Sequence, residues 1–196
     1  MKSAAGSLIS ILGTVTLPFS FEGEQKSHRL EFNVLRHAVH DVILGSPFLK
    51  LTETMTRHVH TIKQKLREVC SPRLCFLGSQ QYVGGWANGT YVDAMPDTGA
   101  HISVMSASFA REHGFAVNTA ETHRKDLEFA DGSMATTMGV VEGVEWNFES
   151  SRGSHWLDVY VLEGLQTDLI LDNTFLLDTD AFVLHEDDFW VDDDQS

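Results

Sequence analysis

The residues Ala94-Met95-Pro96-Asp97-Thr98-Gly99-Ala100, followed by His101-Ile102-Ser103-Val104-Met105-Ser106, decide the fold of this chain. One apolar stretch leads into Asp97-Thr98-Gly99 and another leads out of it, which predicts a strand, a tight turn and a second strand. An aspartate held in such a turn is suited to activate a water molecule. Because a three-residue match is weak by itself, its meaning depends on the rest of the chain.

Short strands dominate the pattern around this turn. The sequence predicts them over residues 81–86, 90–95, 102–105, 140–146, 156–162 and 169–171. Asn88-Gly89 and Asp131-Gly132 are typical of hairpin turns, and a short helix over 106–113 should end at Gly114. We expect the large side chains Phe129, Trp146, Trp156 and Phe175 in the core. Many short strands with frequent turns predict an all-β barrel or sandwich.

A repeated unit indicates how the chain is organised. Residues 27–49 (SHRLEFNVLRHAVHDVILGSPFL) match residues 154–176 (SHWLDVYVLEGLQTDLILDNTFL) at the constant offset that joins His28 to His155. Upstream of these residues the offset is one residue smaller, and Gly13 then aligns with Gly139. Only the second copy is preceded by the Asp97 stretch. Residues 1–56 therefore resemble a truncated tail half of the unit that is complete over 81–185.

The remaining segments are a predicted linker and a predicted tail. Apolar residues at helical spacing from Leu51 to Val69, with Thr52 as a possible cap, predict a helix that extends into a helical and loop linker over 57–80. Residues 186–196 hold six of the acidic residues, so a solvated acidic tail is expected there. Asp178-Thr179-Asp180 lacks a glycine and is interpreted as a turn and helix cap.

Composition excludes several classes of function. The 196 residues carry a formal net charge of -14, which disfavours nucleic-acid binding because phosphate backbones would repel the chain. We expect no membrane span, since no apolar run approaches 18 residues. Two cysteines, Cys70 and Cys75, make no disulfide framework, so reduced thiols and a cytoplasmic location are expected. Their spacing from His58 and His60 does not fit a zinc site, and no metal is predicted.

The order of the motifs resembles a retropepsin-like aspartic protease. Asp97-Thr98-Gly99-Ala100, the hairpin Ala130-Asp131-Gly132-Ser133 and the late apolar stretch 169–171 occur in the order typical of that family. The resemblance is greatest to proteases of long-terminal-repeat retrotransposons and their domesticated fungal relatives. Asp172 departs from the pattern, because the family has a glycine where this residue stands, whereas Gly45 keeps it in the truncated copy.

The resemblance implies a function and a set of site residues. Asp97 would be the catalytic aspartate, with Thr98 and Gly99 shaping its loop, and residues 130–133 would form the tip of a flap over the substrate. One subunit supplies one such aspartate, so a homodimer cleaving peptide or protein substrates is expected, with no cofactor. The alternative is an inactive retropepsin-like binding or dimerisation module. An aspartate at position 172 would disturb proton sharing if it faced Asp97, and would change little if it faced solvent.

Overall fold

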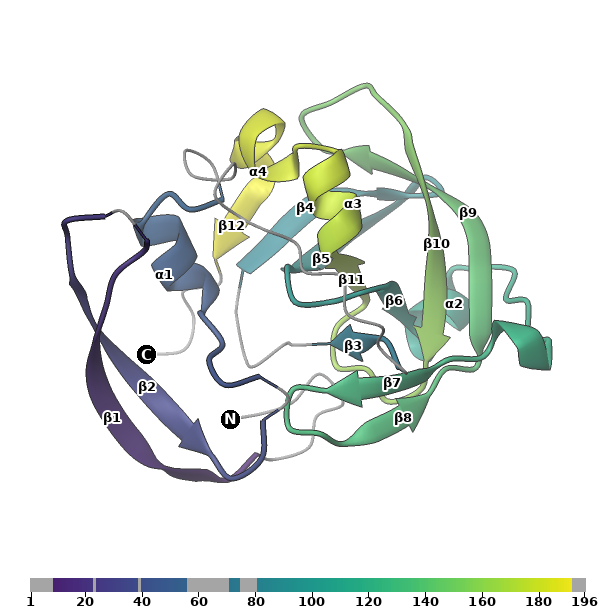
Figure 1. The fold of residues 1–196 in the computed structure, drawn as a ribbon. Coiled ribbons are helices and arrows are strands. Elements are labelled where there is room, and N and C mark those ends of the chain that lie inside the picture. The colour runs from purple at the N-terminus through teal and green to yellow at the C-terminus, as the bar shows by residue number, and fades with distance from the viewer. Residues whose placement is uncertain (1–8, 23, 39, 56–70, 75–80, 192–196) are drawn as a thin grey trace.

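The computed structural model describes residues 9–22, 24–38, 40–55, 71–74 and 81–191 (Figure 1). Within these ranges six strands form a closed barrel, in which each strand pairs with the next and the last pairs back with the first. In order around the barrel they are β4 (Gln81–Ala87), β5 (Thr90–Asp97), β11 (Leu169–Asp172), β6 (Ser103–Ser106), β10 (His155–Leu162) and β9 (Gly139–Phe148). The predicted all-β fold is confirmed.

Local turn chemistry forms the elements on either side of the Asp97 loop. Asn88 and Gly89 both have positive φ, at 48° and 77°, and they join β4 to β5 in the predicted hairpin. The Ser106 side chain accepts a hydrogen bond from the Phe109 amide and caps α2 (Ala107–Glu112). Gly114 follows at φ 70°, so the predicted helix and its glycine stop are confirmed.

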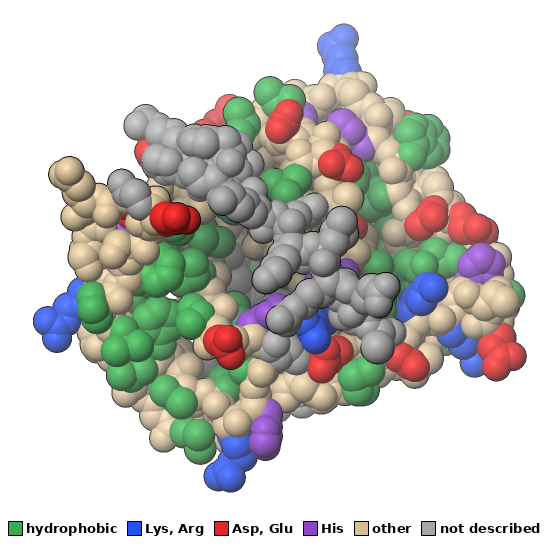
Figure 2. Space-filling view, viewed as in Figure 1, with side chains coloured by type: hydrophobic (Ala, Val, Ile, Leu, Met, Phe, Trp, Pro, Cys, Tyr) green, Lys and Arg blue, Asp and Glu red, His purple; other side chains and the backbone are tan. Residues whose placement is uncertain are grey.

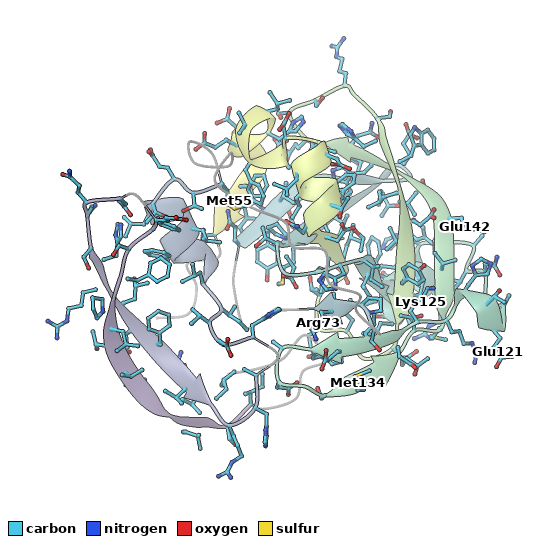
Figure 3. All side chains as sticks on the ribbon, viewed as in Figure 1. Met55, Arg73, Glu121, Lys125, Met134 and Glu142 are labelled. Atoms are coloured by element: carbon cyan, nitrogen blue, oxygen red, sulfur yellow. The ribbon has the colours of Figure 1, made fainter. Side chains whose placement is uncertain are left out.

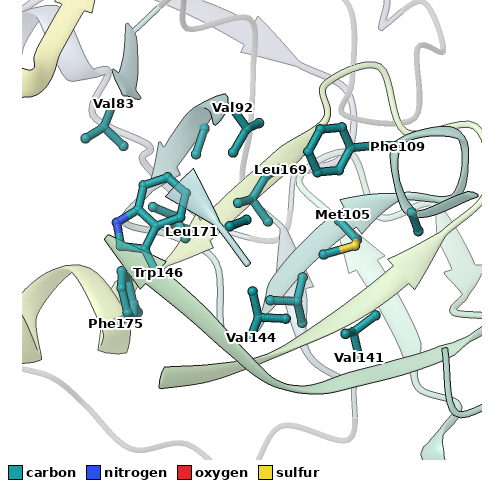
Figure 4. Close-up of a cluster of buried hydrophobic side chains, with 14 of the residues drawn as sticks. Val83, Val92, Met105, Phe109, Val141, Val144, Trp146, Leu169, Leu171 and Phe175 are labelled. Atoms are coloured by element: carbon teal, nitrogen blue, oxygen red, sulfur yellow. The ribbon is translucent and has the colours of Figure 1, made fainter. Parts of the chain in front are cut away.

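The barrel encloses the main hydrophobic core. Trp146 and Phe148 of β9 are fully buried and pack with Met105, Leu171 and Phe175 (Figure 4). The predicted burial of Phe129, Trp146 and Phe175 is confirmed, whereas Trp156 is 67% exposed. Alternation along β10 explains this difference, because residues 155, 157, 159 and 161 face inward and Trp156 therefore faces outward.

A second, smaller sheet lies against the barrel next to the Asp97 loop. It contains β7 (Asp126–Phe129) and β8 (Met134–Thr136), joined by a turn, with the two-residue strand β3 (Arg73–Leu74) parallel to β7 (Figure 1). Its buried residues share a core cluster with the residues around the loop; the cluster contains Leu74, Met95, Ala100, Val104, Leu127, Phe129, Leu162, Leu165 and Ile170. A 3-10 helix, η2 (Glu121–His123), precedes β7.

The C-terminal segment differs from the predicted solvated tail over residues 186–191. After α3 (Asn173–Asp178) and α4 (Ala181–Leu184), the 3-10 helix η3 (Glu186–Asp188) leads into β12 (Phe189–Val191), which pairs with β4. Asp188 is buried because its carboxylate accepts hydrogen bonds from the amide and hydroxyl of Ser150. Trp190 stacks on Tyr82, and residues 192–196 lie outside the described ranges. The prediction of a tail rested on the density of charge, which gives no information about hydrogen-bond partners such as Ser150.

The N-terminal residues form a separate hairpin of β1 (Ile11–Phe19) and β2 (His28–Leu35), followed by α1 (Ser46–Leu51). Its cross-strand pairs Leu17–Leu30 and Val15–Phe32 share one face, while Thr14–Asn33 and Thr16–Glu31 share the other. Apolar side chains gather over this hairpin in the space-filling view (Figure 2). Leu17 remains 48% exposed, so the apolar face is only partly covered.

The predicted helix from Leu51 to Val69 can be compared with the structure only over residues 51–55, where it is not observed. Leu51 ends α1 rather than opening a helix, and the Thr52 hydroxyl donates back to the Phe48 carbonyl at 2.8 Å. Residues 56–70, which hold most of the predicted helix and also His58, His60 and Cys70, lie outside the described residues, as does Cys75. In the part of the chain that is described, no helix is long and apolar enough to cross a membrane.

Candidate active site

Asp97 is the last residue of β5 and is 8% exposed. Its Oδ1 accepts a hydrogen bond from the Gly99 amide at 2.9 Å, and its backbone carbonyl accepts one from the Ala100 amide at 3.0 Å. These two bonds fold residues 97–100 into a tight turn in which the carboxylate orientation is set by the backbone. Thr98 is half-buried within this turn.

Strand β11 runs beside the end of β5 and separates it from β6. It is parallel to β5, so Leu171 pairs with Pro96 and Asp172 pairs with Asp97. On its other side it is antiparallel to β6, where Ile170 pairs with Val104. The next residue, Asn173, donates its amide to the Ala100 carbonyl at 3.1 Å. The Asp97 turn is therefore bonded directly to the strand that carries Asp172.

The Asp172 carboxylate is 9% exposed and is fully engaged by neighbours other than Asp97. Its Oδ1 accepts hydrogen bonds from the amides of Thr174 at 2.8 Å and Phe175 at 3.1 Å, which makes it the N-cap of α3. Its Oδ2 accepts the Ser103 hydroxyl at 2.7 Å, and the Asp172 amide donates to the same Ser103 oxygen at 3.0 Å. Asp172 therefore neither faces solvent nor directs a free carboxylate at Asp97.

The predicted flap is a hairpin whose turn is well formed. The Gly132 amide donates to the Phe129 carbonyl at 2.8 Å, and Gly132 has φ 80°, which favours glycine. The Asp131 carboxylate accepts both the hydroxyl and the amide of Ser133. Ala130 is 1% exposed, so the tip begins after it, while Gly132 and Ser133 are exposed.

Strand β3 connects the Asp97 loop to the part of the flap hairpin next to its turn. The His101 amide donates to the Arg73 carbonyl at 3.0 Å, and the Arg73 guanidinium Nε donates to Glu128 Oε2 at 2.7 Å. Burial lowers the pKa of His101, and the positive charge of Arg73 lowers it further, while Asp172 acts in the opposite direction. His101 therefore favours its neutral form next to the loop.

The structure brings together part of the residue set that the sequence singled out. Asp97, Gly99 and Asp172 are adjacent, and the flap shares the second core cluster with the loop through Leu127 and Phe129. Residues 178–180 end α3, where the Thr179 hydroxyl donates to the Phe175 carbonyl, as expected for a turn.

Two residues next to the loop were not predicted. Ser103 and Arg73 emerge only from the structure, although an aspartate just before an apolar helix pattern is an N-cap signal that predicts the role of Asp172. Within the described residues, no group of three or more histidine, cysteine or acidic side chains could hold a metal ion.

Comparison with known proteins shows similarity over the part of the chain that holds Asp97. Residues 83–175 match the model of the family described as aspartyl protease, which is just under half of the chain. Among solved structures, the chain is similar to the retroviral protease-like domain of Ddi1 from Leishmania major, with 21% identity, 60% of this chain and 88% of that chain covered, and a TM-score of 0.41. The search of curated proteins found no match.

The matched segment holds β5, β6, β9, β10, β11 and the β7–β8 hairpin, with Asp97-Thr98-Gly99 at the end of β5. This match supports a retropepsin-like protease, and the resemblance predicted from the sequence is confirmed.

Proposed function

We propose that this protein is an aspartic endopeptidase in which Asp97 from each of two identical chains forms the catalytic pair. The observation that carries the proposal is the buried Asp97, held by the Gly99 amide at the end of a barrel strand within the aspartyl protease match. The Thr98 and Gly99 positions shape the loop, and residues 130–133 close over the substrate as a flap.

The state of Asp172 supports a pair formed between chains rather than within one. Asp172 is the acidic residue that pairs with Asp97 across β5 and β11, but both of its oxygens are occupied by Ser103 and by the N-terminus of α3. A carboxylate whose two oxygens already accept three hydrogen bonds is poorly placed to activate a catalytic water. In this proposal the second catalytic carboxylate comes from another identical chain, so the working form is a homodimer.

The chemistry follows from two carboxylates that lie close together. Both cannot ionise easily, so they share one proton. The ionised carboxylate takes a proton from a water molecule, which attacks the peptide carbonyl carbon, while the protonated carboxylate donates to the developing oxyanion. The proton then passes to the leaving amine as the C–N bond breaks. No cofactor takes part in these steps.

The N-terminal hairpin is proposed to be the tail half of a second copy of this domain. Its register supports the proposal, because His28 pairs with Phe19 and His155 pairs with Trp146 at the same offset. The one-residue slippage in the sequence coincides with a register shift between Leu157 and Val159, where Gly143 has φ 61°. An origin in a long-terminal-repeat retrotransposon is part of the same proposal.

The test compares the wild-type protein with Asp97→Asn on a peptide library between about pH 3 and 7. We expect cleavage by the wild type and none by Asp97→Asn, with Asp178→Asn, an exposed aspartate in the look-alike triplet, as the matched control that still cleaves. Mixing wild type with Asp97→Asn should reduce activity as the square of the wild-type fraction, because mixed dimers lack one carboxylate. A folded protein that cleaves nothing would favour the inactive binding module instead.

A further inference from the structure

Strand β3 connects the Asp97 loop to the flap hairpin, although it lies before the segment that matches the family. On one side, the Arg73 carbonyl accepts the His101 amide at 3.0 Å and the Arg73 amide donates to His101 Nδ1 at 3.3 Å. On the other side, Arg73 pairs with Glu128 and Leu74 pairs with Phe129 in parallel register. The Pro72 carbonyl also accepts the Glu128 amide at 2.9 Å.

Burial of Leu74 anchors this short strand. Leu74 has no exposed surface and packs in the second core cluster together with Ala100 of the loop and Leu127 and Phe129 of the flap. A strand of two residues has too few backbone hydrogen bonds to hold itself in place. Its position therefore depends on this side chain and on the ion pair of Arg73 in addition to its few backbone bonds.

We expect the ion pair between Arg73 and Glu128 to be stronger than an ordinary surface pair. The two side chains are only 20% and 26% exposed, and Nε lies 2.7 Å from Oε2. Partial burial reduces screening by water and salt, and a charge-assisted hydrogen bond at this distance is directional. Figure 3 shows Arg73 next to the strands of the flap. By contrast, the pair between Arg111 and Glu163 is 62% and 64% exposed.

We propose that Arg73 is a positioning residue that holds the flap hairpin, next to its turn, against the Asp97 loop. Its backbone binds the loop at His101 while its side chain binds Glu128, the residue of β7 that pairs with Met134 beside the turn, so one residue sets the spacing between the two. The consequence for catalysis rests on the proposed protease function: a flap released from β3 closes less well over the substrate. The link that Arg73 makes between His101 and Glu128, here called the tether, depends only on the contacts above.

The first test measures hydrogen exchange, which needs no activity. In the full-length protein, Arg73→Ala and Glu128→Gln should each speed amide exchange in residues 126–136 about tenfold or more, with the barrel strands β9 and β10 unchanged. The exposed pair provides the matched control, because Arg111→Ala should leave flap exchange at the wild-type rate. The charge exchange Arg73→Glu with Glu128→Arg should restore slow exchange.

The second test is kinetic. The released flap should raise KM several-fold while kcat changes less, since the Asp97 turn keeps its own bonds, and the charge exchange should recover the wild-type KM. The tether is overturned if flap exchange is the same in Arg73→Ala and Arg111→Ala, or if exchange rises equally throughout the barrel, which is a loss of global stability. A wild-type protein that cleaves nothing but shows the selective flap effect refutes the protease function and leaves the tether standing.

Discussion

Replacement of Asp172 by glycine, the residue that the family has at this position, tests whether the Asp172 side chain stabilises or destabilises the fold. Asp172 has φ -79° and ψ 167°, an extended conformation that requires no glycine. Its carboxylate accepts three hydrogen bonds, two from the first amides of α3 and one from Ser103. We therefore expect Asp172→Gly to destabilise the protein rather than to repair it.

The magnitude follows from the contacts that are lost. Replacement of an aspartate N-cap by glycine costs only about a few tenths of a kcal/mol. The buried Ser103 hydroxyl left without its charged acceptor costs about 1–3 kcal/mol. Glycine adds about 0.5–1 kcal/mol through the entropy of the unfolded chain. The free energy of unfolding should fall by about 2–4 kcal/mol, which corresponds to a decrease of roughly 4–16 °C in Tm for a chain of this size.

The assay is urea denaturation followed by circular dichroism, with Tm from calorimetry. Asp172→Asn keeps an acceptor for the α3 amides and should lose less than Asp172→Gly. Ser103→Ala removes the shared hydroxyl, and its effect should not add to that of Asp172→Gly, because both remove the same bond. An Asp172→Gly variant as stable as the wild type, or more stable, would refute the role assigned to this carboxylate.

Two further predictions concern the barrel. Burial holds the pKa of His185 below its ordinary value of 6.5, with Asp188 opposing and His155 adding to the shift, so the unfolded chain binds more protons. The contribution of His185 to the free energy of unfolding is complete above pH 6.5 and is lost as the pH falls toward the lowered pKa. Between about pH 8 and pH 5, Tm should therefore fall more in the wild type than in His185→Gln. Equal slopes of Tm against pH in the two proteins would contradict this prediction. Gly139→Ala should lower the free energy of unfolding by about 1–3 kcal/mol, because its Cβ would overlap the Asn118 carbonyl. At the matching position of the N-terminal hairpin, the Cβ of Gly13→Ala meets no atom of the described residues within 4 Å, so this substitution should be neutral in urea denaturation.

Local patterns in the sequence were sufficient to predict much of the barrel. The turns at Asn88-Gly89 and Asp131-Gly132 and the glycine stop of α2 depend on backbone preferences of a few adjacent residues, which the sequence states directly. The motif Asp97-Thr98-Gly99 likewise specified its own turn, since Gly99 bonds to the side chain two residues before it. The exposure of Trp156 follows from alternation along β10, whereas the size of its side chain alone predicted burial.

Only the tertiary structure decided what surrounds Asp97. The bond between Ser103 and Asp172 joins residues 69 positions apart, and the ion pair between Arg73 and Glu128 joins residues 55 apart. No local preference specifies such pairs, because they form only when β11 enters between β5 and β6 and when β3 adds to the flap sheet. The same reason explains Asp188, whose charge predicted solvent and whose partner Ser150 lies on the neighbouring loop. Composition and spacing determined the class of fold, while long-range hydrogen bonds determined the partners of Asp172 and Asp188.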